Sequence, residues 1–219
     1  MIGTLRETEL HAELKRYYAG PIDQLEAAVD GYVVDVLRGS GIVEIQTHNF
    51  TALKPKLPRL LAAHPVTLVH PVAAAKWIVR LDARRRFVSR RKSPRRGQLE
   101  DLFLELVSCP ELMMNPNLTL EVILIHEEEH RLPVRRRWRD WRVCNRRLLA
   151  VIDRVTFAAP ADFRRFIPRD LPQPFTSGEL AAALDRPLML AQKITYCLRR
   201  MGVIEPLGRR GHAVLYQEC

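Results

Sequence analysis

Two short apolar runs joined by a tight turn constrain the fold of this chain most strongly. Residues 32–37 read Tyr-Val-Val-Asp-Val-Leu, and residues 42–45 read Ile-Val-Glu-Ile. Runs this short, rich in β-branched residues and bounded by turn residues, are typical of buried strands. The Arg-Gly-Ser-Gly sequence at 38–41 is a turn signal between them. The sequence therefore predicts a β-hairpin over residues 32–45.

Each strand of this hairpin contains one carboxylate, Asp35 in the first and Glu44 in the second. A carboxylate in a buried strand loses its hydration and is costly to keep ionised. A bound cation would offset that cost, so we expect Asp35, Glu44 and the main-chain carbonyl of Ile45 to bind a divalent ion, Mg²⁺ or Mn²⁺. The alternative is that both carboxylates lie on a solvated face of an edge hairpin.

The charge of the chain indicates a polyanionic partner. Its 219 residues are 47% hydrophobic, enough for a buried core, and carry a formal net charge of +10. Nucleic acid is the first expectation and an anionic membrane surface the second. No apolar run approaches the roughly 20 residues needed to span a bilayer. The absence of a signal-peptide pattern and of any CxxC pair among the four cysteines predicts a cytoplasmic protein with reduced thiols.

Secondary-structure signals around the hairpin predict an α/β core with a mixed central sheet flanked by helices. A helix is expected over residues 5–18 and a strand over 25–29, before the hairpin. After it, the pattern predicts a helix through residues 51–61, a strand at 66–69 and another at 77–79.

The remainder of the chain is organised around two arginine-rich runs. Residues 84–96 hold eight Arg or Lys and no acid, and predict a loop or a hairpin arm. An amphipathic helix over 99–107 and a strand over 118–125 follow. Residues 131–147 hold eight arginines and one acid, and we expect a helical connector there that continues through 148–157. The expected domains are an α/β core at 1–130, this connector at 131–160 and a C-terminal domain at 161–219.

The C-terminal domain has its own pattern. Thr176 or Ser177 caps a helix, residues 185–187 form a turn, and a second helix runs over 188–201 to Gly202. Two strands follow around a basic turn at 208–212. This order resembles a small winged helix-turn-helix, a module that binds DNA or proteins. The residues expected to contact DNA are Arg95, Arg96, Arg135, Arg136, Arg137, Lys193, Arg199, Arg200, Arg209 and Arg210.

The N-terminal part of the chain, over roughly residues 5–80, resembles the PD-(D/E)XK restriction-endonuclease-like superfamily. The resemblance is carried by the order helix, three strands, helix, strand, and by Asp35 followed nine residues later by Glu44-Ile45-Gln46. It implies Mg²⁺-dependent hydrolysis of a DNA phosphodiester bond by an endonuclease. Asp35 and Glu44 would then bind the metal, and Gln46 would position the attacking water. An acidic residue of the first helix sometimes joins such sites, and Glu13 is a candidate here.

This sequence departs from the superfamily pattern at two positions. Gln46 stands where the superfamily usually has Lys, and Gln can bond to water but brings no positive charge. Lys54 or Lys56, early in the next helix, could supply that charge instead. The proline of the motif is absent, because Val34 precedes Asp35, and Asp30 just before the strand is a rival ligand for the metal.

Three other interpretations stay open. The core could be catalytically inactive in a DNA-binding regulator or assembly factor, or the substrate could be RNA, because positive charge does not distinguish the two. A homodimer would suit double-strand cleavage. The sequence from His126 to His130 matches the HExxH zinc-protease pattern. On the expected strand, however, the two imidazoles would be roughly 13 Å apart, too far to share a metal.

Overall fold

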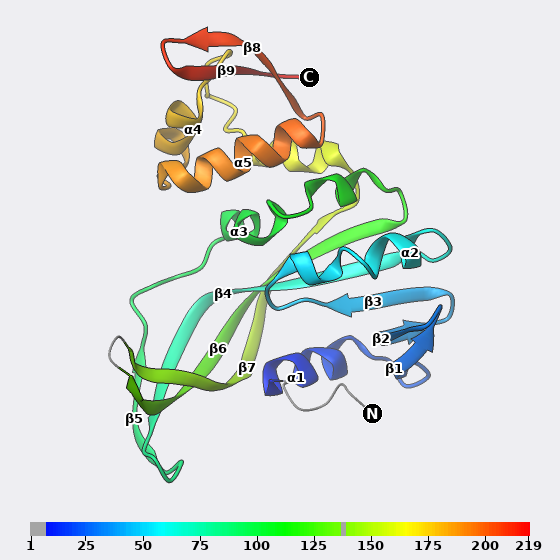
Figure 1. Ribbon diagram of the computed structural model, residues 1–219, viewed down its shortest axis with the longest axis vertical. Helices are drawn as coiled ribbons and strands as arrows, with labels where there is room; N and C mark the ends of the chain where they lie inside the picture. Colours follow the sequence, from blue (N-terminus) through cyan, green and yellow to red (C-terminus); the bar gives the residue numbers. More distant parts are fainter. Residues whose placement is uncertain (1–7, 137–138) are drawn as a thin grey trace.

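A mixed seven-stranded sheet organises the computed structural model, which describes residues 8–136 and 139–219 (Figure 1). The strand order is β1-β2-β3-β4-β6-β7, with β5 paired to β4. Strands β3, β4 and β6 are parallel to one another, and the other pairs are antiparallel. The strands are β1 Gln24–Val29, β2 Tyr32–Arg38, β3 Gly41–Ile45, β4 Val66–Leu81, β5 Phe87–Lys92, β6 Leu118–Arg136 and β7 Arg139–Phe157. The predicted α/β class with a mixed sheet is confirmed.

Helices cover both faces of the sheet (Figure 1). Helix α1 (Glu9–Tyr18) packs on one face, and α2 (Leu57–Leu61) and α3 (Phe103–Leu106) cover the other. Successive residues of a strand point to opposite faces, so Ile42 and Val43 of β3 lie in different hydrophobic clusters. The predicted hairpin of β2 and β3 is confirmed, and its two faces are both buried.

The crossover from β3 to β4 is less regular than the predicted helix over 51–61. It consists of a 3₁₀ helix, Phe50–Leu53, followed by α2. Pro58 lies in the first turn of α2, where its missing N–H has no helical acceptor to lose. The helix expected at 99–107 is likewise a 3₁₀ helix, Leu99–Leu102, that continues into α3.

Strand β4 is longer than the sequence patterns indicated. The segments 66–69 and 77–79, expected as two strands, belong to one strand of 16 residues. Its parallel pairing with β6 runs from Val66 to Arg80 and shifts register once, between Ala73 and Ala75. This shift lets one strand bend while it stays paired. Strand β5 then pairs back on β4, so the first arginine-rich run forms a hairpin arm, as expected.

The helical connector expected over residues 131–160 is wrong. Strand β6 continues to Arg136 and β7 runs from Arg139 to Phe157, so the expected domain boundary at residue 130 falls inside a strand. The two strands form a long antiparallel ladder with several register shifts. β-branched residues such as Val151, Ile152 and Val155 suit this ladder better than a helix. His126 and His130 lie on β6, which excludes the helical spacing that an HExxH zinc site requires.

The C-terminal unit begins directly after β7. It contains a 3₁₀ helix, Pro160–Phe166, then α4 (Ser177–Leu184), α5 (Leu188–Arg200), and a hairpin of β8 (Ile204–Arg210) and β9 (Ala213–Glu218). The Thr176 hydroxyl caps α4 by accepting the Glu179 N–H, as the sequence predicted. Phe163 and Phe175 belong to the same hydrophobic cluster as Ile42 of the sheet, so this unit shares the core. No helix in the described residues is long and apolar enough to cross a membrane.

Gly97 marks a close approach between the segment after β5 and strand β4. Its N–H donates to the Ala73 carbonyl at 2.8 Å. An added Cβ would lie 2.7 Å from that oxygen and 2.9 Å from Val72 Cγ1. We expect Gly97→Ala to lower the free energy of unfolding by about 1–3 kcal/mol, because the two segments must separate. Chemical denaturation measures this change. The control is Gly178→Ala in α4, where the added Cβ meets no atom closer than 3.6 Å, and an equal loss there would contradict the explanation.

Candidate functional site

The two carboxylates lie where β2 and β3 separate. The ladder between these strands ends at the pair Val36↔Val43, one residue short of Asp35 and Glu44. Beyond that pair, carboxylate side chains take the place of the main-chain hydrogen bonds between the two strands. The Asp35 N–H donates to Glu44 Oε1 at 3.3 Å, and the Ile45 N–H donates to Asp35 Oδ2 at 2.8 Å. Each carboxylate therefore accepts a main-chain donor that the separating strands would otherwise leave without a partner.

Lys56 completes one side of this cluster. Its ammonium group lies 2.7 Å from Glu44 Oε1 and donates to the Val33 carbonyl at 2.6 Å. The side chain comes from the residue that precedes α2, so the β3–β4 crossover brings it back over the strand ends. The site thus has a cation in direct contact with the second carboxylate.

His11, a half-buried residue of α1, completes the other side of the cluster. Its Nε2 lies 2.9 Å from the Ile45 carbonyl oxygen and 3.3 Å from Asp35 Oδ2. An acidic residue of this helix was expected at the site, and the histidine was not. The available signal was its position directly after Leu10, which is fully buried. We define His11, Asp35, Glu44 and Lys56 as the carboxylate cluster.

The pKa values of the two carboxyl groups in the cluster are shifted in opposite directions. Burial acts to raise the pKa of Asp35, but the hydrogen bond and charge of His11, the Ile45 N–H and the charge of Lys56 together bring that pKa below its ordinary value. Burial and the neighbouring negative charge of Asp35 raise the pKa of Glu44, against the opposing effect of Lys56. A pair of carboxyl groups with pKa values pushed apart is typical of functional sites.

Gln46 and Lys54 lie away from the cluster. The Gln46 amide group donates to the carbonyls of His48 and Asn49 at 2.6 and 3.0 Å, so it holds the loop after β3. The expectation that it positions a water beside the carboxylates is therefore not supported by its contacts. Lys54 acts electrostatically on Cys109 and Glu111.

The two accessory acids expected near the site also have other partners. Glu13 faces β7, where its Oε2 accepts the Leu148 N–H at 2.6 Å. Asp30, in the β1–β2 turn, lies 3.0 Å from His64 Nε2. These contacts do not favour either residue as a metal ligand. His11 occupies the place on α1 that an acid was expected to take.

The donor set of the cluster suits a hard divalent cation. Asp35 Oδ2 and Glu44 Oε1 accept protein hydrogen bonds, whereas Asp35 Oδ1 and Glu44 Oε2 have none from the described residues. These two oxygens are the atoms left to coordinate Mg²⁺, which binds through one or two carboxylates and keeps several waters. Among the described residues, no group of three His, Cys, Asp or Glu side chains is arranged to hold a metal ion. Any ion here would therefore be only partly held by side chains.

The basic residues expected to bind DNA differ in exposure and in whether they form ion pairs. Arg200 pairs with Glu111, and Arg210 pairs with Glu179 at 2.6 Å. Arg95 and Arg96 are exposed after β5. Arg135 and Arg136 end β6, and Arg137 lies outside the described residues. In the part of the chain that the structure describes, the residues without an ion-pair partner include Lys193, Arg199 and Arg209.

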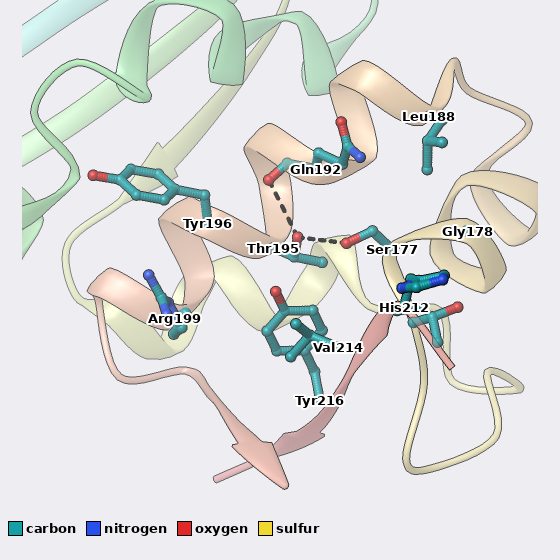
Figure 2. Close-up of a pocket in the computed structure, with 12 residues that line it drawn as sticks. Ser177, Gly178, Leu188, Gln192, Thr195, Tyr196, Arg199, His212, Val214 and Tyr216 are labelled. Atoms are coloured by element: carbon teal, nitrogen blue, oxygen red, sulfur yellow. Dashed lines mark hydrogen bonds between the residues drawn. The ribbon is translucent and has the colours of Figure 1, made fainter. Parts of the chain in front are cut away.

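A hollow of about 440 Å³ lies between α5 and the C-terminal hairpin (Figure 2). Gln192, Tyr196 and Arg199 line it from α5, one helical turn apart. Across from them are the start of α4 and residues of β9 and its turn, including His212. The Ser177 and Thr195 hydroxyl groups are hydrogen-bonded at 2.9 Å and join the two helices. This surface offers polar, aromatic and cationic groups on one open side of α5.

Comparison with known proteins assigns the chain to a family. Residues 8–158 match the family model of DUF8091, a domain of unknown function, and the chain belongs to this family. An uncharacterized protein of Treponema pallidum (strain Nichols) is 30% identical over 221 residues, covering 99% of this chain and 87% of the relative. No solved structure matches. The family match ends with β7, so it covers the whole sheet and the carboxylate cluster, whereas the relative also covers the C-terminal unit.

The opposite charges beside Glu44 predict opposite changes in its pKa. We expect the pKa of Glu44 to lie above the ordinary value of about 4.3 and to fall in Asp35→Asn, which removes the neighbouring negative charge. In Lys56→Met it rises further, because the stabilising cation is lost. Carboxyl ¹³C chemical shifts measured against pH report both changes. Shifts of the same sign in the two variants would show that the cluster's electrostatics are not as described.

Proposed function

We propose that this protein is a metal-dependent nuclease that hydrolyses phosphodiester bonds, with DNA as its substrate. The observation that carries the proposal is the ammonium group of Lys56, 2.7 Å from Glu44 beside Asp35 at the point where β2 and β3 separate. The superfamily that the sequence resembles combines two acids with a lysine at such a site. Here Lys56, the residue before α2, supplies the charge that Gln46 lacks.

Each residue of the carboxylate cluster has a role that follows from its contacts. Asp35 and Glu44 would hold Mg²⁺ through their remaining oxygens, and the bound ion would polarise the scissile phosphate and acidify a water. Lys56 stabilises negative charge that develops on the phosphate, because its ammonium group is fixed by Glu44 and the Val33 carbonyl. His11 fixes the orientation of Asp35.

A cleavage assay on the full chain tests this assignment. With Mg²⁺ or Mn²⁺, we expect the wild-type protein to cleave at least one of plasmid, single-stranded or branched DNA. Asp35→Asn and Lys56→Met should each lower the rate by about 100-fold or more, which is the typical cost of losing a group that stabilises transition-state charge. Lys54→Met, two residues earlier and outside the cluster, is the matched control and should keep wild-type activity.

Two outcomes decide against the assignment. Unchanged cleavage in both Asp35→Asn and Lys56→Met would place the active site elsewhere. Cleavage of RNA and of no DNA substrate would change the substrate class while keeping the site.

The C-terminal unit supports nucleic-acid binding under this proposal. Its order of helix, helix and hairpin resembles a winged helix, and the open side of α5 carries Gln192, Tyr196 and Arg199 (Figure 2). The half-buried Lys193 and the exposed Arg209 add charge on the same unit. These groups suit contacts with phosphates and base edges, and the net charge of +10 favours the same partner.

Substituting two neighbouring arginines of α5 tests whether this helix contacts DNA or whether the overall charge of the protein alone causes binding. Arg199→Gln should reduce the slope of log K against log salt for duplex DNA by about one, the change expected for one phosphate contact. Arg200→Gln should change the slope less, because this side chain is already paired with Glu111. Fluorescence anisotropy over a salt series measures both slopes. Equal slopes for the wild type and Arg199→Gln would show that Arg199 of α5 does not contact a phosphate of the DNA.

A second candidate function is a DNA-binding regulator or assembly factor whose core does no chemistry. One observation favours it: Asp35 and Glu44 accept main-chain N–H groups, so they brace the separating strands whether or not a metal binds. Tight DNA binding with no cleavage by any form of the protein would favour this function. The cleavage assay above therefore distinguishes the two.

A further inference from the structure

A second hollow, of about 480 Å³, lies next to the loop that follows β3. Thr47, two residues after Ile45, lines it, and so does His70 of β4. His70 Nδ1 lies 2.7 Å from the carbonyl oxygen of Gln46, the residue that follows β3. The hollow therefore begins where the strand that carries Glu44 ends. Its size is in the range of small-molecule sites.

One wall of this hollow carries an excess of positive charge. Lys76, Arg131 and Arg146, from β4, β6 and β7, face it. They share only two carboxylates. Lys76 Nζ lies 3.1 Å from Glu127 and 2.8 Å from Glu129. Arg146 binds Glu127 at 2.6 Å, and Arg131 binds Glu129. On this wall three cations therefore face two anions, while the carboxylates of Asp101 and Glu105 line the hollow elsewhere.

Arg95 is a fourth cation that lines the same hollow. Its guanidinium group has no ion-pair partner among the described residues, and the residue is exposed. Fully buried Glu127 Oε1 has no well-directed hydrogen bond, although Lys76 Nζ is near it. An ammonium group has three donors, so Lys76 keeps donor capacity for a ligand.

Another wall offers hydrogen-bond acceptors. His70 is 5% exposed, and because a carbonyl oxygen only accepts, its Nδ1–H must donate to Gln46. Burial lowers the pKa of His70, which leaves the ring neutral with Nε2 as an acceptor. Glu105 Oε2 accepts the Phe50 N–H at 3.2 Å, and its Oε1 has no hydrogen bond from the described residues. Val72, Leu104 and Trp141 supply apolar lining.

We propose that this hollow binds one nucleotide of the nucleic-acid strand, next to the phosphate that faces the carboxylate cluster. The nucleotide's phosphate group binds Lys76 and Arg95, and the base places the two N–H bonds of its exocyclic amino group toward Glu105 and His70. A simple anion would leave the acceptor wall unused, and a simple cation would meet the positive wall. The ligand must therefore carry both an anionic group and hydrogen-bond donors, as a nucleotide does. The inference rests on the proposed function for the identity of the strand, but binding itself needs no catalysis.

Titration of the full chain with AMP, without divalent metal, tests the inference. The indole N–H signal of Trp141, assigned with Trp141→Phe, reports on the hollow in NMR spectra. We expect AMP to shift this signal, and adenosine and inorganic phosphate to bind at least 10-fold more weakly than AMP. Arg95→Gln should weaken AMP binding about 10-fold. Arg84→Gln, an exposed arginine of the β4–β5 turn outside the hollow, is the matched control and should not.

Two results would overturn the inference. Inorganic phosphate binding as tightly as AMP would define an anion site without base recognition. AMP binding that moves no Trp141 signal and is unchanged by Arg95→Gln would lie elsewhere on the protein. Repeating the titration and the cleavage assay in Asp35→Asn separates this inference from the proposed nuclease function, because unchanged cleavage with retained AMP binding would count against the nuclease site alone.

Discussion

The exchange of main-chain hydrogen bonds for carboxylate hydrogen bonds at the ends of β2 and β3 is the interaction on which the candidate site depends. Two strands that separate inside a sheet leave buried N–H groups without partners, which costs free energy. Asp35 and Glu44 each meet one of these groups with one oxygen. The second oxygen of each carboxylate is thereby held in place by an interaction that also stabilises the fold. Lys56 and His11 then adjust the charge of a pair that the backbone has already positioned.

Local sequence patterns located the hairpin and its two acids, because strand periodicity and turn residues act over a few neighbours. The same patterns offered Lys54 and Lys56 as alternatives without choosing between them, and they did not indicate His11. Lys56 lies 12 residues from Glu44 along the chain, and His11 lies 34 residues from Ile45. Such contacts depend on the angle of a crossover and on how α1 docks, which no local pattern encodes. Gln46 occupied the expected sequence position, but its amide group turned to the loop instead.

The error over residues 131–157 has a different origin. Dense arginine suits a solvated helix as well as a strand, so composition left the choice open. Pairing decided it: β6 lies between β4 and β7, and its ladder with β7 gives hydrogen-bond partners to a segment that is otherwise polar. Acids of β6 then neutralise part of that arginine charge, as Glu127 does for Arg146. The net charge of the chain therefore overstates the charge available to a partner, and the unpaired cations are the informative ones.

The shared core of the sheet and the C-terminal unit has a geometric consequence. Phe163 and Phe175 pack in the same cluster as the sheet residues, and β7 leads into the unit with no tether between them. A unit joined in this way cannot swing independently. The distance between the open side of α5 and the carboxylate cluster is then a fixed property of the fold. Under the proposed function, this fixed distance would set how far the cleaved phosphodiester bond lies from the bases that α5 contacts.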